Sequence, residues 1–288
     1  MRRSGEEIIP MPEWRELPFE NMSGTVMLIG GPDSGKSTLA EWLVDQLVKA
    51  GNGPVCHLDG DMGQSALGVP TTMNLAIRCE GERNLHHIAC FFVGSTSPRG
   101  HMLPVLVGAR RLLERAGREG GRTVVVDSTG MVSGPAGATL KHWKAEILLP
   151  DWIFFLQHKH ELVHLLVPMR KDPRFRVVVL PVGPHVIPRS SQERTARRRA
   201  GFRAYFSLAE KHVLPGEDLP VYGKVDPGPF TLLGLENEKG LLETVALFLS
   251  RSDREWTYLA PDHAPDRIRK ISVGSLRVDP KTGMELPS

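Results

Sequence analysis

The chain has 288 residues, of which 36 are lysine or arginine and 33 are aspartate or glutamate, so its formal net charge is +3. Apolar residues make up 41% and charged residues 24%, values that exclude a disordered chain and are typical of a globular protein. No apolar stretch approaches the roughly 18 residues of a transmembrane helix, and the N-terminus lacks the apolar segment of a secretory signal. The three cysteines do not make a disulfide framework, so we expect a cytoplasmic protein that binds no membrane.

Apolar runs alternate with helical patterns through the first two thirds of the chain. Because strands that alternate with helices build parallel sheets covered on both faces, this order predicts an α/β fold. Past residue 215 glycine and proline become frequent, and the short apolar runs there are typical of antiparallel strands. In chain order, the predicted elements are a strand at 25–29, a helix at 37–50, a strand at 54–58, a strand at 87–93, a helix at 103–116, strands at 123–126, 152–156 and 176–180, a basic helical segment at 190–211, and strands at 230–233, 271–273 and 275–278.

The segment between the first predicted strand and the first predicted helix fits the phosphate-loop pattern G-x-x-x-x-G-K-[ST] at every position. Its glycines let backbone N–H groups face phosphate oxygens, and the dipole of the following helix favours the same anion. We expect Lys36 to reach the β- and γ-phosphates and the Ser37 hydroxyl to bind Mg²⁺. ATP is the expected nucleotide, because the chain has no N-K-x-D guanine-reading segment. The predicted nucleotide-binding residues are Gly30, Gly31, Pro32, Asp33, Ser34, Gly35, Lys36, Ser37 and Thr38.

Carboxylates directly follow the second predicted strand. Asp59 and Asp61 stand where ligands of open α/β sheets bind, outside the carboxyl ends of the strands. We expect one of them to hold Mg²⁺ through water and the other to accept a proton from an attacking hydroxyl, which Gln64 could orient. Asp127 ends a further apolar strand and is a rival Mg²⁺ ligand to Asp59.

A basic segment spans residues 189–211. Arginine dominates it, and the planar guanidinium suits phosphate oxygens, so we interpret the segment as a lid over a phosphate site. One arginine could act on the transferring phosphoryl group, and others, such as Arg197, could hold a nucleic-acid backbone. A solvated helix face is the alternative interpretation. The basic residues are Arg189, Arg194, Arg197, Arg198, Arg199, Arg203 and Lys211, against the acids Glu193 and Glu210.

Taken together, these motifs resemble the polynucleotide 5'-hydroxyl kinases, a family that includes the RNA kinase subunit of the mRNA 3'-cleavage and tRNA-splicing machinery. The most specific shared motif is D-x-D-x-G-Q, which begins at Asp59 and ends at Gln64. Arg194 and Arg198 meet the R-x-x-x-R spacing of the family's arginine lid. The segments 94–98 and 274–279 are similar to the family's Gly…Ser-Pro segment and C-terminal strand segment.

The segment 127–131 stands where the family has N-T-x-G-W. The resemblance implies that Ser128, Gly130 and Met131 bind the terminal nucleotide. Met131 replaces an aromatic residue that in the family holds this nucleotide by stacking. Methionine can still pack against a base, but stacking worth about 1–3 kcal/mol would be lost.

The resemblance therefore implies an ATP- and Mg²⁺-dependent kinase that phosphorylates the 5'-hydroxyl end of RNA or DNA. Its catalytic residues would be Lys36, Asp59, Asp61, Arg194 and Arg198, and its metal ligands Ser37 with Asp59 or Asp127. The implied fold is a P-loop NTPase, with a mostly parallel sheet flanked by helices and a small C-terminal β-rich region. We predict an irregular N-terminal lead-in over 1–20, a P-loop kinase domain over 21–215 with its arginine-rich lid at 189–211, and the β-rich region over 216–288.

Two other classes of protein stay open. The same loop and lid occur in small-molecule kinases that act on nucleosides or nucleotides. A non-catalytic ATP-binding scaffold of an RNA-processing complex is the second alternative, and Met131 at the aromatic position keeps it open.

Overall fold

The computed structural model describes residues 8–82, 84–184, 186–215, 219–224 and 226–287. Residues 1–7 of the predicted lead-in, and residues 216–218, 225 and 288 of the predicted C-terminal region, lie outside the described residues.

The chain divides into two compact units, and neither is continuous in sequence. Unit 1 comprises Met1–Asp61, Asn74–Ile88 and Val105–Arg189, and unit 2 comprises Met62–Met73, Ala89–Pro104 and Ser190–Ser288.

The first sheet has the strand order β4-β3-β2-β5-β1-β6-β7, counted over the described residues. β1 runs parallel to β5 and β6, β2 runs parallel to β5, and β6 runs parallel to β7. β3 is an exception, because it runs antiparallel to β2. Since the other pairs named here are parallel, the prediction of a mostly parallel sheet is confirmed. The strands are β1 (Gly24–Gly30), β2 (Val55–Gly60), β3 (Thr72–Arg78), β4 (His86–Phe92), β5 (Thr123–Ser128), β6 (Trp152–Gln157) and β7 (Arg176–Pro181).

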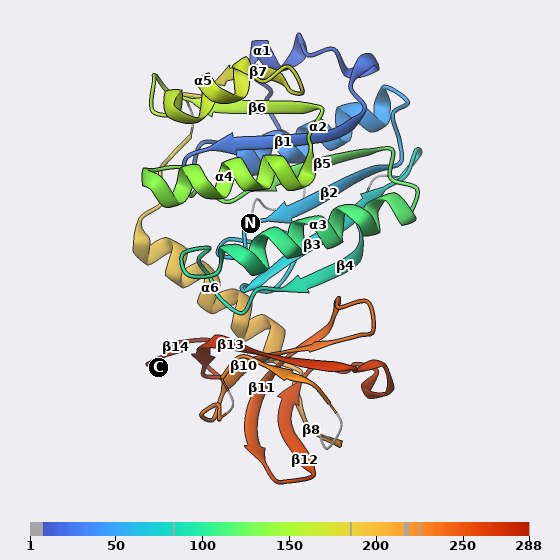
Figure 1. Cartoon of the computed structure of the whole chain (residues 1–288), viewed down its shortest axis with the longest axis vertical. Coiled ribbons are helices and arrows are strands. Elements are labelled where there is room, and N and C mark those ends of the chain that lie inside the picture. The colour runs from blue at the N-terminus through green and yellow to red at the C-terminus, as the bar shows by residue number, and fades with distance from the viewer. Residues whose placement is uncertain (1–7, 83, 185, 216–218, 225, 288) are drawn as a thin grey trace. The chain divides into compact units, whose positions relative to one another are not determined.

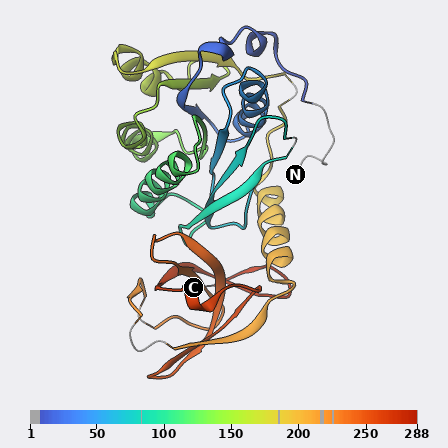
Figure 2. The ribbon, with the colours of Figure 1, turned by 90° about the vertical axis from the view of Figure 1, so that its right-hand side faces the viewer.

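Helices cover both faces of this sheet. In Figure 1, α3 and α4 lie on the near face and α2 lies behind, and Figure 2 shows the helices on either side of the strands. Val26 and Leu28 of β1 pack toward α2, whereas Met27 and Ile29 pack toward α4 and α5. The helices are α1 (Pro12–Arg15), α2 (Lys36–Lys49), α3 (Met102–Arg118), α4 (Gly134–Leu148), α5 (Val163–Lys171) and α6 (Ser191–Phe206), with 3-10 turns η1 (Phe19–Asn21) and η2 (Pro265–Arg267).

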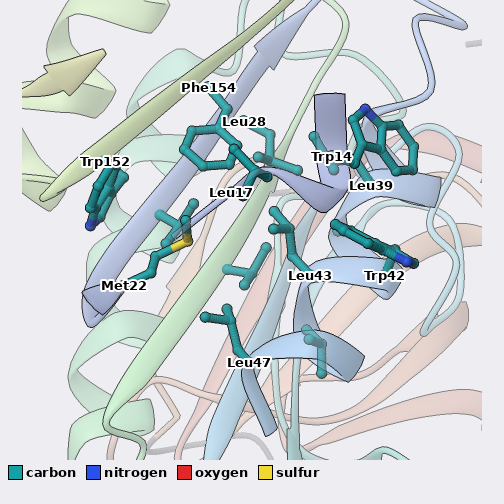
Figure 3. Close-up of a cluster of buried hydrophobic side chains, with 14 of the residues drawn as sticks. Trp14, Leu17, Met22, Leu28, Leu39, Trp42, Leu43, Leu47, Trp152 and Phe154 are labelled. Atoms are coloured by element: carbon teal, nitrogen blue, oxygen red, sulfur yellow. The ribbon is translucent and has the colours of Figure 1, made fainter. Parts of the chain in front are cut away.

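The described part of the predicted lead-in is ordered against α2 rather than irregular. Trp14 of α1 is buried, and its ring centroid lies 5.5 Å from that of Trp42. Phe19 meets the same Trp42 ring edge-on at 5.3 Å. Figure 3 shows both tryptophans beside Leu39 and Leu43 of α2. The apolar area buried by these rings holds the N-terminal segment on unit 1.

The second sheet belongs to unit 2 and has the order β14-β13-β10-β11-β12-β8 among the described strands, with β9 paired to β13. Its neighbours are antiparallel, apart from the short parallel contact between β9 and β13. The predicted C-terminal β-rich region is therefore confirmed. Its strands are β8 (Glu210–Pro215), β9 (Val221–Tyr222), β10 (Thr231–Glu236), β11 (Leu242–Arg251), β12 (Glu255–Ala260), β13 (Lys270–Val278) and β14 (Glu285–Leu286).

The basic helix α6 starts with a capping box, in which the Ser190 hydroxyl accepts from the Glu193 backbone and the Glu193 carboxylate accepts from the Ser190 backbone. The prediction that the helix extends to residue 211 is wrong at its end. Glu210 and Lys211 belong to β8, because they pair with β12. The boundary predicted at residues 215–216 falls inside unit 2, where Phe202 of α6 packs in one core cluster with residues of β10 and β11.

Within the described ranges, the structure contains no helix with the length and apolar character that crossing a membrane requires.

Candidate functional site

The phosphate loop connects β1, which ends at Gly30, to α2, which begins at Lys36. Gly35 is the N-cap of α2 and has a φ of +86°, a left-handed conformation that glycine adopts without steric cost. Glycine has no side chain, so the N-cap residue itself does not cap the first N–H groups of α2. These N–H groups and the helix dipole therefore offer a site for an anion, as the loop pattern predicts.

Lys36 is buried at the base of this loop. Its ammonium group donates to the carbonyl oxygen of Gly31 at 2.7 Å and lies 3.4 Å from the hydroxyl of Ser34. Burial lowers the pKa of Lys36, and the carboxylates of Asp127 and Asp61 oppose that shift. The ammonium of Lys36 thus lies inside the loop, at the place where the loop would surround the phosphates of a nucleotide.

Ser37 and Asp127 join the loop to the neighbouring strand β5. The Ser37 hydroxyl donates to Oδ2 of Asp127 at 2.5 Å. Oδ1 of Asp127 is buried and has no hydrogen-bond partner among the described residues. Burial raises the pKa of Asp127 to about 7, and the negative charge of Asp59 acts in the same direction, while Lys36 and Ser37 act against it. A serine hydroxyl and a carboxylate oxygen that has no hydrogen-bond partner among the described residues are ligands that suit Mg²⁺.

Asp59 and Asp127 are register partners on the parallel strands β2 and β5. Both side chains are buried at the carboxyl ends of their strands. Oδ1 of Asp59 accepts a hydrogen bond from the backbone N–H of Asp61 at 3.1 Å. The structure therefore brings the predicted carboxylates to one edge of the sheet, beside the phosphate loop.

The segment after β5 lies against the phosphate loop. A Cβ atom on Gly130 would lie 2.8 Å from the Cα and N atoms of Pro32, so only glycine fits at this approach. The Ser128 hydroxyl is fully buried and donates to the carbonyl oxygen of Leu28 at 2.6 Å, so the structure gives this side chain a role inside the sheet. Met131 is half-buried.

Two buried lysines of α4 were not predicted from the sequence. Lys141 and Lys144 are fully buried, although lysine is almost always exposed. The Lys141 ammonium donates to the Ser128 hydroxyl at 2.7 Å and to the Thr129 carbonyl oxygen at 2.5 Å. Both lysines occupy positions of the buried stripe of α4, but a lysine in a helical pattern ordinarily marks the exposed face, so the sequence alone carries no signal for their burial.

The other predicted residues belong to unit 2. Nε2 of Gln64 donates to the backbone carbonyl oxygen of Arg194 at 3.2 Å, and a guanidinium N–H of Arg197 lies 3.5 Å from the carbonyl oxygen of Ser65. Arg198 forms an ion pair with Glu285 at 2.6 Å. Gln64 and helix α6 are thus in direct contact within unit 2.

In unit 1, the loop, its buried lysine and a serine bonded to a carboxylate of the neighbouring strand define a P-loop nucleotide-binding protein. Residues 30–208 match the family described as mRNA cleavage and polyadenylation factor CLP1 P-loop. The chain belongs to this family, and the resemblance drawn from the motifs is confirmed.

Archaeal proteins are among its most similar relatives. The polyribonucleotide 5'-hydroxyl-kinase of Methanocaldococcus jannaschii is 33% identical over 255 residues, which cover 85% of this chain and 68% of that protein. The polyribonucleotide 5'-hydroxyl-kinase of Thermococcus kodakarensis is 36% identical over 65% of this chain and 52% of its own length. The polyribonucleotide 5'-hydroxyl-kinase of Pyrococcus horikoshii is 31% identical over 83% of this chain and 66% of its own length.

Solved structures share the fold. A chain of the wild-type Clp1p–Pcf11p complex superposes with a TM-score of 0.66 at 15% identity, covering 89% of this chain and 75% of that one. A second structure concerns the Pcf11p–Clp1p interface and ATP loss in a point mutant. It gives a TM-score of 0.68 at 14% identity, and the match covers 92% of this chain and 78% of that one. The predicted P-loop fold is thereby confirmed.

Proposed function

We propose that the protein is an ATP-dependent polynucleotide 5'-hydroxyl kinase that transfers the γ-phosphate of ATP to the 5'-hydroxyl end of RNA or DNA. The observation that carries the proposal is the bond between Ser37 and Asp127 beside Lys36, because it assembles a phosphate loop with a carboxylate of the next strand. The names of the archaeal relatives support a polynucleotide as the acceptor. The structure concerning ATP loss supports ATP as the donor in a protein of the same fold.

The phosphate loop would bind the triphosphate of ATP. Backbone N–H groups of residues 33–38 would surround the β-phosphate, and the ammonium of Lys36 would exchange its contact with Gly31 for phosphate oxygens. Because Lys36 is buried, its charge acts on these oxygens with little screening by water.

The residues present fit a magnesium ion. Ser37 and Asp127 would hold it, with Asp59 close by on the register-paired strand. Oδ1 of Asp127, which has no hydrogen-bond partner among the described residues, would be a further ligand atom. When bound, Mg²⁺ would neutralise charge on the β- and γ-phosphate oxygens.

The acceptor would be the 5'-hydroxyl of a polynucleotide. Asp61 or Asp59 would take the proton of this hydroxyl while its oxygen bonds to the γ-phosphorus. The bond between the γ-phosphorus and the bridging oxygen breaks in the same step, so the products are a 5'-phosphate end and ADP. Arg194, Arg197 and Arg198 have the chemistry to bind phosphate oxygens of nucleotide or polynucleotide, and we propose that role for α6.

The test is transfer of labelled γ-phosphate from ATP to RNA and DNA oligonucleotides of one sequence, each with a 5'-hydroxyl end. We expect label on at least one of them with the wild-type protein and none with Lys36→Ala. The ratio of RNA to DNA labelling assigns the substrate. Labelled small molecules instead of oligonucleotide would favour a nucleoside or nucleotide kinase, and ATP binding without any transfer would favour a scaffold.

A further inference from the structure

Helix α4 carries two lysines on its buried side. The buried positions recur every three or four residues, which is the spacing of one helix face that packs on a sheet. An ammonium group on such a face is costly unless polar partners compensate for its lost hydration. The buried residues of α4 are Gly137, Leu140, Lys141, Lys144, Ala145 and Leu148.

Lys141 has such partners at the carboxyl end of β5. Its ammonium donates to the Ser128 hydroxyl at 2.7 Å and to the Thr129 carbonyl oxygen at 2.5 Å. The Ser128 hydroxyl in turn donates to the carbonyl oxygen of Leu28, two residues before the phosphate loop. Lys141 therefore ties the ends of β5 and β1 to helix α4.

The segment that Lys141 holds continues directly into the contact with the phosphate loop. Gly130 follows Thr129 and lies so close to Pro32 that an added Cβ would come within 2.8 Å of its backbone. A shift of the Thr129 carbonyl would therefore move Gly130 and Met131 relative to the loop. Hydrogen bonds in a buried site of low dielectric are stronger than in water, so this tie is well suited to fix the segment.

We propose that Lys141 is a positioning residue, which fixes residues 129–131 against the phosphate loop so that the acceptor end is held in line with the γ-phosphate. This inference rests on the proposed function. Lys141 is fully buried and donates to Ser128 and Thr129, so it would act through this segment and not by contact with a substrate.

Lys144 provides a matched comparison on the same helix. It is also fully buried, but its ammonium has no hydrogen-bond partner among the described residues. If positioning depends on the hydrogen bonds of Lys141 and not on buried positive charge, removing the Lys144 ammonium leaves residues 129–131 in place.

The experiment compares Lys141→Met and Lys144→Met, which keep an unbranched side chain as far as the ε position and remove the terminal nitrogen. Oligonucleotide concentration is varied at saturating ATP, nucleotide affinity is measured separately by calorimetry, and hydrogen exchange is followed at the amides of residues 129–133. For Lys141→Met we expect kcat/KM for the oligonucleotide to fall about 10- to 100-fold, the loss that a small misplacement of reacting groups produces. Nucleotide affinity should stay within about threefold, and residues 129–133 should exchange faster.

Lys144→Met should keep wild-type exchange at residues 129–133 and a kcat/KM within about threefold of wild type. Ser128→Ala, which removes one acceptor of Lys141, should lower kcat/KM in the same direction, and its effect should not add to that of Lys141→Met. If both substitutions remove the same contact, the loss of kcat/KM in the double variant is smaller than the sum of the two single losses. Independent effects on packing would add.

Normal kcat/KM and normal exchange in Lys141→Met would overturn the inference while leaving the proposed kinase intact. Equal losses in Lys141→Met and Lys144→Met would also overturn it, since buried charge would then be the cause. Should the wild-type protein transfer no phosphate, the proposed function fails, and the exchange measurement alone still decides whether Lys141 fixes the segment.

Discussion

The hydroxyl of Ser37 lies 2.5 Å from Oδ2 of Asp127, so the first turn of α2 is bonded to the end of a strand far along the chain. The second oxygen of the same carboxylate is buried without a hydrogen-bond partner in the described part of the chain. A buried carboxylate that is only half satisfied weakens the fold, and in the proposed function a Mg²⁺ ion that binds with the nucleotide would satisfy it.

Asp127→Asn is expected to stabilise the nucleotide-free protein. Burial raises the pKa of Asp127 from 3.8 to about 7, so its contribution to stability is full below about pH 3.8 and is lost as the pH rises through about 7. At pH 8, where the ionised carboxylate carries the whole penalty, the substitution should raise the free energy of unfolding by up to roughly 4 kcal/mol. Urea unfolding at pH 5 and pH 8 measures this, and the gain should be smaller at pH 5. A lower stability of Asp127→Asn at pH 8 would contradict the account, as would undiminished phosphate transfer.

Gly130→Ala is expected to disturb the phosphate loop. The new Cβ would lie 2.8 Å from backbone atoms of Pro32, which cannot move without shifting the loop. We expect nucleotide affinity to fall about tenfold or more, since a forced contact of this kind costs about 1–3 kcal/mol. Calorimetric titration with nucleotide measures the change. Gly117→Ala on α3 is the control, because a Cβ there meets open space among the described residues, and it should leave the affinity unchanged.

Met131→Trp is expected to improve binding of the polynucleotide end. Met131 stands where the polynucleotide 5'-hydroxyl kinases that this chain resembles have an aromatic residue. Stacking of a base on an aromatic ring contributes about 1–3 kcal/mol. The KM for a 5'-hydroxyl oligonucleotide should therefore fall about tenfold, while the KM for ATP stays the same. Steady-state kinetics with each substrate varied in turn decide the matter. An unchanged KM for the oligonucleotide would show that Met131 lies away from the terminal base.

Trp14→Ala is expected to destabilise the fold without changing the chemistry. The Trp14 side chain is buried against Trp42, which lies more than one turn along α2 from Lys36. Removal of such a large buried side chain costs about 3–5 kcal/mol of unfolding free energy. Denaturant unfolding measures the loss, and phosphate transfer per folded molecule should match the wild type. A loss below about 1 kcal/mol would mean that the N-terminal segment adds little to unit 1.

The parts of the site that are contiguous in sequence could be predicted. The phosphate loop carries all of its information within a few neighbouring residues, and the strand before it and the helix after it were also recognisable. The register partnership of Asp59 with Asp127 depends on β2 lying beside β5, which the order of elements along the chain does not reveal.

Other features could not be read from local pattern. β3 escaped detection because the buried polar residues Thr72 and Asn74 interrupt its apolar run. Lys141 looks like a surface lysine until α4 is docked on the sheet, since only tertiary packing buries it. The end of α6 was misplaced because Glu210 and Lys211 suit an exposed helix as well as an edge strand, and pairing with β12 decides between them.

The central claim is that the phosphoryl group passes from ATP to the 5' oxygen of a polynucleotide at the loop that contains Lys36. The most direct test is to label a 5'-hydroxyl RNA with γ-labelled ATP, digest the product to nucleotides and locate the label. The account predicts that the label appears only as the 5'-monophosphate of the first nucleotide, that an RNA already phosphorylated at its 5' end takes up none, and that Lys36→Ala yields none. Label on an internal or 3'-terminal nucleotide, or labelling that survives in Lys36→Ala, would contradict it.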